Sequence, residues 1–538
     1  MEIRKLLVAN RGEIAARVFR ACAAEGIATV AVVAPDDRGS LHARAAGEVV
    51  EISGYLDSEE HIRAARETGA DAIHPGYGFL AENADFAEAV EAAGLVFVGP
   101  TPEALRQGGD KLAAKRAAEG ADVPVLPTGA PEEIGFPLMI KAAAGGGGRG
   151  MRVVREAAEL EDAAAAARRE AKAAFGDETI FFERYLERPR HVEIQLLADG
   201  FGNVYSLGER ECSIQRRHQK VLEEAPSPAL GHERRERMSG AAIAFARAIG
   251  YRSLGTVEFL LEGRDFFFLE LNGRIQVEHP VTEEATGLDL VALQLAVARG
   301  EELPDPRASF SRHAVEVRLY AEDPVEFLPQ AGTVTRLRLP GSIRVDAGVA
   351  EGDEVGVAYD PMIAKLIASA ATREGALDRL SAALAETEVE GVTTNLRFLR
   401  WLVSHPTVRA GVATTAFLTE FPPLSSVPAH LPTGPWASPW RLNLPPPAAR
   451  PVPDPDSPSH DHRHTGEQSA LVAPMPGTVI RVAVAEGDRV EARQPLVVLE
   501  AMKMETPVVS PYEAVVRAIH VAEGDRVAGG MVLVELED

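Results

Sequence analysis

The chain has 538 residues, of which 46% are hydrophobic and 25% are charged, and its formal net charge is −24. This length exceeds what one hydrophobic core holds and predicts three or four domains, while the acidity argues against nucleic acid or an anionic membrane surface as a partner. Only two cysteines occur, the N-terminus runs straight into a strand pattern, and no apolar run approaches the ~20 residues of a membrane span. We therefore expect a soluble, cytoplasmic protein that binds neither nucleic acid nor membranes.

The first 110 residues alternate between strand and helix patterns. Residues 4–9 have the pattern of a short buried strand, and a turn at 10–13 precedes an amphipathic helix. Further strand patterns follow at 71–74 and 95–98. This rhythm predicts a Rossmann-like, doubly wound parallel domain. No GxGxxG motif follows the first strand, so a dinucleotide site is not predicted.

The segment 74–83 (HPGYGFLAEN) places Tyr77 between two glycines, directly after a buried strand. Open α/β sheets bind ligands at the carboxyl ends of their strands, which makes Tyr77 a candidate binding residue. The spacing alone favours a tight turn that holds a packed tyrosine. Both interpretations stay open at this point.

Four consecutive glycines at 145–148, followed by Arg149 and Gly150, make neither a good helix nor a good strand. They allow backbone N–H groups to wrap closely around an anion. Strand patterns on both sides favour a hairpin tip over a flexible linker, and Lys111 and Lys141 belong to two neighbouring elements. We expect a glycine loop over phosphate groups, which is not a P-loop because no Gly-Lys-Ser/Thr follows.

The segment 212–220 (CSIQRRHQK) concentrates cationic and hydrogen-bonding side chains in nine residues. A run of charges is usually a solvated face. In an extended segment, however, His218 and Lys220 share one side, which favours an anion site.

The densest chemistry follows a predicted hairpin of strands at 256–261 and 266–271. Polar residues alternate strictly over nine positions, and we expect them on one side of a strand, where burial requires partners. They are Glu270, Asn272, Arg274, Gln276 and Glu278, with Glu258 on the preceding strand. Two carboxylates and an asparagine suit magnesium. An arginine can hold an oxyanion, and a carboxylate beside cations can stay ionised and act as a base.

The last third of the chain changes character twice. Residues 312–421 begin with an alternating strand that carries Arg318 and continue with helix patterns, which predicts an α+β subdomain. Residues 422–468 are rich in proline and predict a semi-rigid, mostly disordered linker. Its three histidines between 460 and 464 lack cysteines or a surrounding fold, so we do not expect a metal site there.

The C-terminal segment contains an internal repeat. Residues 484–490 (VAEGDRV) recur as 521–527, which predicts two similar β-halves packed as a flattened barrel. Lys503 lies between two methionines (EAMKME) and between the halves. A lysine at an exposed hairpin tip is a candidate attachment point for a prosthetic group.

In order, the chain carries HPGYGFLAEN, KAAAGGGGRGM, ERYLERPRHVEIQ, QRRHQK, ELNGRIQVEHPVTE, RLYAEDP and EAMKME. Together these motifs resemble the biotin carboxylase/biotin carboxyl carrier (α) subunit of bacterial acyl-CoA carboxylases of the acetyl-/propionyl-CoA carboxylase type. EAMKME is similar to the biotinyl-lysine motif, whereas lipoyl carriers typically place the lysine after aspartate. The resemblance implies a multidomain α/β and α+β protein with five parts: a Rossmann-like domain (1–110), an ATP-grasp domain (111–311), an α+β C-terminal subdomain (312–421), the linker (422–468) and an all-β biotinyl/lipoyl-type barrel (469–538).

The resemblance also implies a reaction. An ATP-grasp ligase would use ATP, bicarbonate and magnesium or manganese to carboxylate biotin on Lys503 through carboxyphosphate. The implied ATP contacts are Lys111, Lys141, Gly147, Gly148, Glu183, Leu186, His191, Gln215 and His218, and the implied metal ligands are Glu258, Glu270 and Asn272. The implied bicarbonate contacts are Lys220, Arg274, Gln276 and Val277, with Glu278 as the base. Arg318 would stabilise the biotin enolate, and Tyr77 would lie near the biotin ring.

Implied partners are a separate carboxyltransferase (β) subunit, a biotin protein ligase and a second copy of the chain, with a role in fatty acid metabolism. Related subunits often carry an interaction barrel before the carrier, of which the chain shows only an edge-like segment at 434–441. The docking mode and the acyl-CoA therefore stay open. Two other hypotheses are another ATP-grasp ligase fused to a carrier and a non-catalytic biotin carrier or scaffold.

Overall fold

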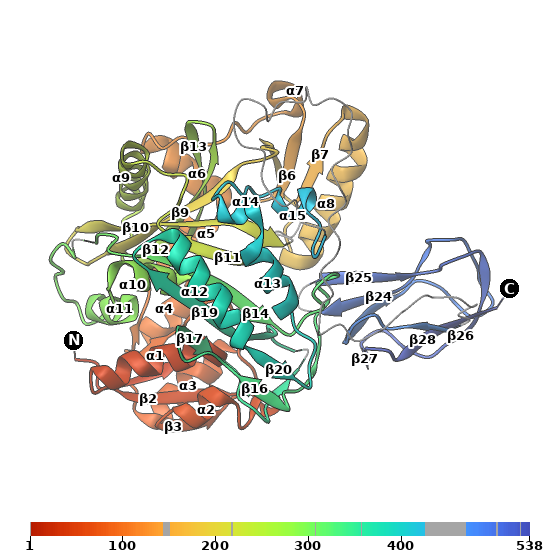
Figure 1. The fold of residues 1–538 in the computed structure, drawn as a ribbon, viewed down its shortest axis with the longest axis horizontal. Coiled ribbons are helices and arrows are strands. Elements are labelled where there is room, and N and C mark those ends of the chain that lie inside the picture. The colour runs from red at the N-terminus through yellow and green to blue at the C-terminus, as the bar shows by residue number, and fades with distance from the viewer. Residues whose placement is uncertain are drawn as a thin grey trace.

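The computed structural model describes residues 2–143, 151–216, 219–306, 308–356, 358–425, 470–501, 504–527 and 529–537. Most of the predicted linker, together with Gly147, Gly148, His218 and Lys503, lies outside the described residues. Figure 1 shows a large α/β part and a smaller all-β part that projects from its side.

The N-terminal part is built on a parallel five-stranded sheet of order β3-β2-β1-β4-β5. Its elements are β1 (Lys5–Val8), α1 (Gly12–Ala24), β2 (Ala28–Val33), η1 (Pro35–Asp37), α2 (Leu41–Ala45), β3 (Glu48–Glu51), α3 (Ser58–Thr68), β4 (Ala72–His74), α4 (Ala84–Ala92), β5 (Val96–Phe97) and α5 (Pro102–Gly109). Successive residues of β1 belong to different cores, with Leu7 in one and Leu6 and Val8 in the other. Both faces of the sheet are therefore covered, as in a doubly wound fold.

The centre of the molecule is an antiparallel sheet of eight strands in the order β13-β12-β9-β10-β11-β14-β19-β17. The strands are β9 (Arg190–Ala198), β10 (Val204–Arg216), β11 (Gln219–Ala225), β12 (Ser253–Glu262), β13 (Asp265–Asn272), β14 (His313–Tyr320), β17 (Arg344–Ala347) and β19 (Met362–Ala370). The helices α6 (Lys111–Gly120), α9 (His232–Ala248), α10 (His279–Thr286) and α11 (Leu290–Ala298) pack against it or beside it. This sheet runs without a break across residue 311, where the sequence predicts a domain boundary.

A small antiparallel sheet of order β7-β6-β8 lies beside the central one. It consists of β6 (Leu138–Ala142), β7 (Arg152–Val154) and β8 (Ile180–Arg184), with α7 (Pro131–Ile134), η2 (Ala157–Glu159) and α8 (Leu160–Phe175). Ile140 pairs with Arg152, so the two strands that flank the glycine run form the predicted hairpin.

The third segment covers the β14–β19 end of the central sheet with α12 (Arg373–Glu386) and α13 (Leu396–Ser404). Its other elements are β15 (Gly332–Thr333), β16 (Arg336–Arg338), β18 (Glu354–Val355), β20 (Glu388–Glu390), α14 (Pro406–Arg409) and α15 (Phe417–Glu420). Leu377, Leu380 and Phe398 pack with Val315 and Leu366 of the sheet in one buried core.

The C-terminal part has two four-stranded antiparallel sheets. The strands are β21 (Ala470–Val472), β22 (Gly477–Val482), β23 (Arg489–Val490), β24 (Pro495–Ala501), β25 (Met504–Val509), β26 (Ala514–Ile519), β27 (Arg526–Val527) and β28 (Val532–Glu537). Gly487 and Gly524 occupy equivalent turns with φ of 90° and 93°, as the sequence repeat predicts. Ala501 and Met504 are register partners in the β24–β25 hairpin, on either side of Met502 and Lys503.

The predicted fold class is confirmed, and two local predictions are wrong. The segment 212–220 is not one extended piece, because Arg216 pairs with Gln219 and the chain reverses between them. The predicted strand at 270–278 ends at Asn272. In the part of the chain that the structure describes, no helix has the length and hydropathy of a membrane span.

Gly76 provides a test of the turn that presents Tyr77. Gly76 and Gly78 both have left-handed backbones, with φ of 64° and 66°. A Cβ on Gly76 would lie 2.7 Å from Nδ2 of Asn10, whereas a Cβ on Gly78 meets nothing within 4 Å. We expect Gly78→Ala to cost about 1–2 kcal/mol of stability, the price of a left-handed alanine, and Gly76→Ala to cost more. Thermal unfolding of both variants measures the difference, and equal losses would show that Asn10 exerts no constraint.

Candidate active site

A row of charged side chains crosses the central sheet. Glu270 on β13 is the register partner of Glu258 on β12, which in turn is the partner of Glu193 on β9. Arg210 on β10 stands opposite Glu193 on the other side. Directly paired residues point to the same face of a sheet, so three carboxylates and one guanidinium converge there.

Lys220 is the cation at the centre of this row. Its ammonium lies 2.6 Å from Glu193, 2.7 Å from Glu258 and 2.5 Å from Glu278, and its side chain is 11% exposed. Burial lowers the pKa of Lys220, but the three carboxylates outweigh burial and raise it well above its usual value. Lys220 therefore stays charged at neutral pH.

Both oxygens of Glu278 face cations. Oε1 accepts a hydrogen bond from Lys220, and Oε2 accepts one of 2.9 Å from Arg318 on β14. Arg318 also donates to Glu223 on β11 over 2.7 Å. Burial raises the pKa of Glu278, but Lys220 and Arg318 bring it well below its usual range. Glu278 is therefore an ionised carboxylate at the start of α10.

Glu258, Glu270 and Asn272 fit a magnesium ion by their donor chemistry. Burial and the charge of Glu258 raise the pKa of Glu270, more than Lys111 lowers it. The side-chain carboxylate of Glu270 makes no hydrogen bond with the residues that the structure describes. Asn272 lies beside the pair and donates to Glu258 over 2.9 Å. Two repelling carboxylates with a neighbouring amide are stabilised by a hard divalent cation.

Beyond the end of β13, the backbone leaves the sheet, yet the next polar side chains turn back to the same site. Arg274 donates to Asn272 over 2.6 Å and lies 3.0 Å from Glu82 of the N-terminal part. Gln276 donates to Glu258 over 3.2 Å. The alternating polar residues thus belong to one site, as the sequence predicts, although the backbone from Gly273 to Glu278 is not a strand.

A second cationic cluster lies on the small sheet. Glu183 of β8 pairs through one oxygen with Lys141 of β6 and through the other with Lys115 of α6. Lys115 also donates to the carbonyl of Leu126 over 2.9 Å. Lys111 opens α6 after the capping residue Asp110, and burial lowers the pKa of Lys111 while Glu270 opposes the shift. Leu186 is buried just after β8.

His191 connects the row of charges to Gln215. Its Nε2 lies 3.0 Å from Glu258, and its Nδ1 lies 3.0 Å from the Gln215 amide. Burial lowers the pKa of His191, but Glu258 raises it further than burial lowers it. Among the predicted ATP contacts, Lys111 lies near Lys141, Glu183 and Glu270, and His191 lies between Gln215 and Glu258. Gly147, Gly148 and His218 lie outside the described residues.

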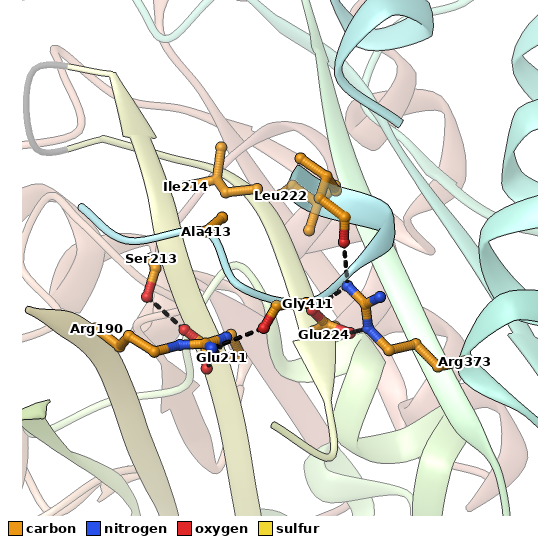
Figure 2. A pocket seen from close by; sticks show the side chains of 10 residues that line it. Arg190, Glu211, Ser213, Ile214, Leu222, Glu224, Arg373, Gly411 and Ala413 are labelled. Atoms are coloured by element: carbon orange, nitrogen blue, oxygen red, sulfur yellow. Dashed lines mark hydrogen bonds and ion pairs between the residues drawn. The ribbon is translucent and has the colours of Figure 1, made fainter. Parts of the chain in front are cut away.

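A small cavity lies next to His191 in the chain, and Figure 2 shows Arg190, Glu211 and Ser213 among its lining residues. The backbone N–H of His191 donates to the hydroxyl of Ser213, which donates to Glu211, and Arg190 pairs with Glu211 over 3.0 Å. Arg190 also donates to the carbonyl of Gly411 over 2.7 Å. The cavity between these groups has a volume of about 10 Å³, about the space of one water molecule. The cavity is too small for a substrate, and the hydrogen bonds around it connect β9 to β10 and to the loop at Gly411.

Tyr77 both packs against a core and takes part in a polar network. Its ring contacts the N-terminal core, and its hydroxyl donates to the carboxylate of Glu13. Lys365 lies 3.0 Å from the same carboxylate and donates to the carbonyl of Val277 over 2.8 Å. Tyr77 and Val277 are thus linked through two charged groups, next to Glu278.

Several residues of the site have no predicted role in the sequence, among them Lys115, Glu193, Arg210 and Lys365. Glu193 could have been predicted as a site residue, because it alternates with His191 and Gln195 in the strand pattern HVEIQ. The other three are charged residues in ordinary helix or strand patterns. Only the strand pairing and helix packing reveal that they face the site.

Models of protein families match nearly the whole chain. They are biotin carboxylase, N-terminal domain (residues 2–105), carbamoyl-phosphate synthase L chain, ATP binding domain (110–306), biotin carboxylase C-terminal domain (316–420) and biotin-requiring enzyme (469–536). The chain is 48% identical over 440 residues to the biotin carboxylase of Halalkalibacterium halodurans, which covers 78% of this chain and 97% of that protein.

Two further relatives are informative. The chain is 45% identical to the methylcrotonoyl-CoA carboxylase subunit alpha of Oryza sativa over 445 residues, which is 78% of this chain but only 60% of that protein. The biotin carboxylase domain dimer of the Hydrogenobacter thermophilus 2-oxoglutarate carboxylase, solved with MgADP, ADP and bicarbonate, has a TM-score of 0.76 and 42% identity over 78% of this chain and 98% of that chain.

The chain therefore belongs to the biotin carboxylase family and carries a biotin-carrier type domain at its C-terminal end. The resemblance drawn from the sequence motifs is confirmed. The predicted cofactors ATP, magnesium, bicarbonate and biotin agree with the family models and with the ligands of the solved relative.

Removal of the Lys220 charge tests the electrostatics of the site. In Lys220→Met, Glu258 and Glu278 lose the cation that lowers their pKa values most, so the pKa of each carboxyl in the folded state rises relative to the wild type. A raised carboxyl pKa removes stability as the pH rises. We expect the loss of stability relative to the wild type to grow as the pH rises from about pH 4 to about pH 8.

Thermal unfolding across this pH range measures the effect. Lys172→Met on the exposed face of α8, where the lysine side chain is 67% exposed, is the matched control and should show no pH-dependent difference. A loss in Lys220→Met that is the same at every pH would contradict the proposed charge balance.

Proposed function

We propose that this biotin carboxylase family member uses ATP and bicarbonate to carboxylate biotin held covalently on Lys503. The observation that carries the proposal is the Lys220–Glu278–Arg318 arrangement, in which an ionised carboxylate is held between two cations at the edge of a predicted metal and phosphate site. Such a site can bind an anion and remove a proton from it.

The predicted nucleotide contacts suit a triphosphate. Lys111 and Lys141 would neutralise phosphate charge, and Glu183 fixes the position of Lys141. The glycines 147 and 148 and His218 remain predicted contacts. Glu258, Glu270 and Asn272 would hold magnesium, which supplies positive charge for the developing phosphate oxygens. Their position beside His191 and Lys220 supports a shared metal and phosphate site.

Bicarbonate would bind near Lys220, Arg274, Gln276 and the backbone of Val277. When the anion draws on the positive charge of Lys220, Glu278 becomes a better base and accepts the hydroxyl proton of bicarbonate. The bicarbonate oxygen then attacks the γ-phosphorus, the bond to ADP breaks, and carboxyphosphate forms. Loss of its carbon–oxygen bond to phosphate gives carbon dioxide and inorganic phosphate.

The final steps would take place next to Arg318 and Tyr77. Phosphate would accept the proton of the biotin ureido nitrogen, which then attacks carbon dioxide. Arg318 would stabilise the negative charge that develops on the ureido oxygen. The network from Tyr77 through Glu13 and Lys365 to Val277 supports a shared location for the biotin and bicarbonate sites.

We further propose that the carboxylated carrier delivers its group to a separate carboxyltransferase subunit, which carboxylates an acyl-CoA of the acetyl-/propionyl-CoA carboxylase type. The name of the rice relative, an alpha subunit of a CoA carboxylase, supports a shared complex. The dimer of the solved relative supports self-association through the biotin carboxylase part. A biotin protein ligase would modify Lys503.

An assay with free biotin tests the reaction. We expect bicarbonate-dependent ADP release that free biotin stimulates, and a decrease of about 100-fold or more in Glu278→Gln through loss of the base. Glu236→Gln on an exposed face of α9 is the control and should retain activity. Lys503→Arg should lose covalent biotin by mass spectrometry yet still carboxylate free biotin. No stimulation by free biotin in the wild type would favour another ATP-grasp ligase.

Purification of the native complex tests the partner. We expect a carboxyltransferase subunit to copurify and the complex to carboxylate acetyl-CoA, propionyl-CoA or a branched enoyl-CoA. The isolated chain should carboxylate free biotin but none of the CoA esters. A complex that carboxylates pyruvate and no CoA ester would contradict the acyl-CoA proposal.

A further inference from the structure

Arg210 is a fully buried arginine behind the predicted bicarbonate site, with 0% exposure. A guanidinium carries five N–H donors in a rigid plane. All five have acceptors here. The acceptors are Glu193 (2.5 Å from Nε), Gln195 and Thr282 (2.6 and 3.0 Å from Nη1), and Thr256 and Gln276 (3.0 and 2.9 Å from Nη2).

These bonds fix the polarity of Gln276. Because Oε1 of Gln276 accepts from Arg210, its amide nitrogen turns the other way and donates to Glu258 over 3.2 Å. Gln276 thus presents N–H groups to the site. An anion accepts hydrogen bonds and is repelled by a carbonyl oxygen, so this amide orientation favours bicarbonate.

The same guanidinium orients Glu193. Nε of Arg210 donates a hydrogen bond to Oε1 of Glu193, and Oε2 of Glu193 accepts one of 2.6 Å from Lys220. Arg210 therefore contacts one group of the predicted anion site directly, the Gln276 amide, and reaches a second, the Lys220 ammonium, through Glu193. The hydroxyl oxygens of Thr256 and Thr282 accept hydrogen bonds from Nη2 and Nη1 of Arg210.

We propose that Arg210 is a positioning residue for bicarbonate: it holds Gln276 with its N–H groups toward the anion and holds Lys220 through Glu193. This inference deepens the proposed function and rests on it. The nucleotide contacts Lys111, Lys141 and Glu183 make no hydrogen bond with Arg210 among the described residues, so its removal should affect bicarbonate binding and not ATP binding.

Arg210→Lys tests the proposal, because lysine keeps the charge but cannot span five acceptors in one plane. We expect the KM for bicarbonate to rise roughly 10-fold or more, as for the loss of a hydrogen bond to a charged group, with less than about a twofold change in the KM for ATP. Arg235→Lys is the control, since Arg235 pairs with Glu209 of the same strand β10 and contacts no predicted bicarbonate ligand.

Thr282→Val and Thr256→Val provide a second test should Arg210→Lys fail to fold. Each removes one acceptor of the guanidinium at constant size, and each should raise the KM for bicarbonate by a smaller factor in the same direction. Equal changes in both KM values, or a loss of kcat alone, would overturn the positioning role. Absence of bicarbonate-dependent ADP release in the wild type would instead overturn the proposed function.

Discussion

The buried charge balance around Lys220 is the constraint on which the rest of the site depends. An ion removed from water costs several kcal/mol unless partners of opposite charge compensate for it. Here Glu193, Glu258 and Glu278 surround one ammonium, and Arg210 and Arg318 balance the excess of negative charge. Each member pairs with at least one opposite charge of the group, so the removal of any one changes the charge balance of the others.

The fold assembles this unit by strand register. Cross-strand pairing aligns Glu270, Glu258 and Glu193, and the continuous central sheet brings Arg318 from a strand that lies beyond the predicted domain boundary. The N-terminal part adds Glu82 and the network through Glu13. The site therefore lies where three segments of the chain meet, although most of its charges come from one sheet.

The sequence motifs predicted the fold class and the family because they combine unusual residues at fixed spacing. The alternation of polar residues from Glu270 to Glu278 predicted a shared site correctly but a nine-residue strand wrongly. A polar residue at every second position does not distinguish a strand from an irregular segment whose polar side chains point to one site. Lys115 and Arg210 could not be predicted. Each is a charged residue in an ordinary helix or strand pattern, and its partners come from segments distant in the sequence.

The fate of the bicarbonate oxygens tests the central claim most directly. If Glu278 activates bicarbonate for attack on the γ-phosphate, turnover with bicarbonate labelled with heavy oxygen transfers label into inorganic phosphate. Mass spectrometry of the phosphate should show one labelled oxygen from bicarbonate for each ADP released. Bicarbonate-dependent and biotin-stimulated ADP release with unlabelled phosphate would contradict the account, because carboxyphosphate would not then be the intermediate.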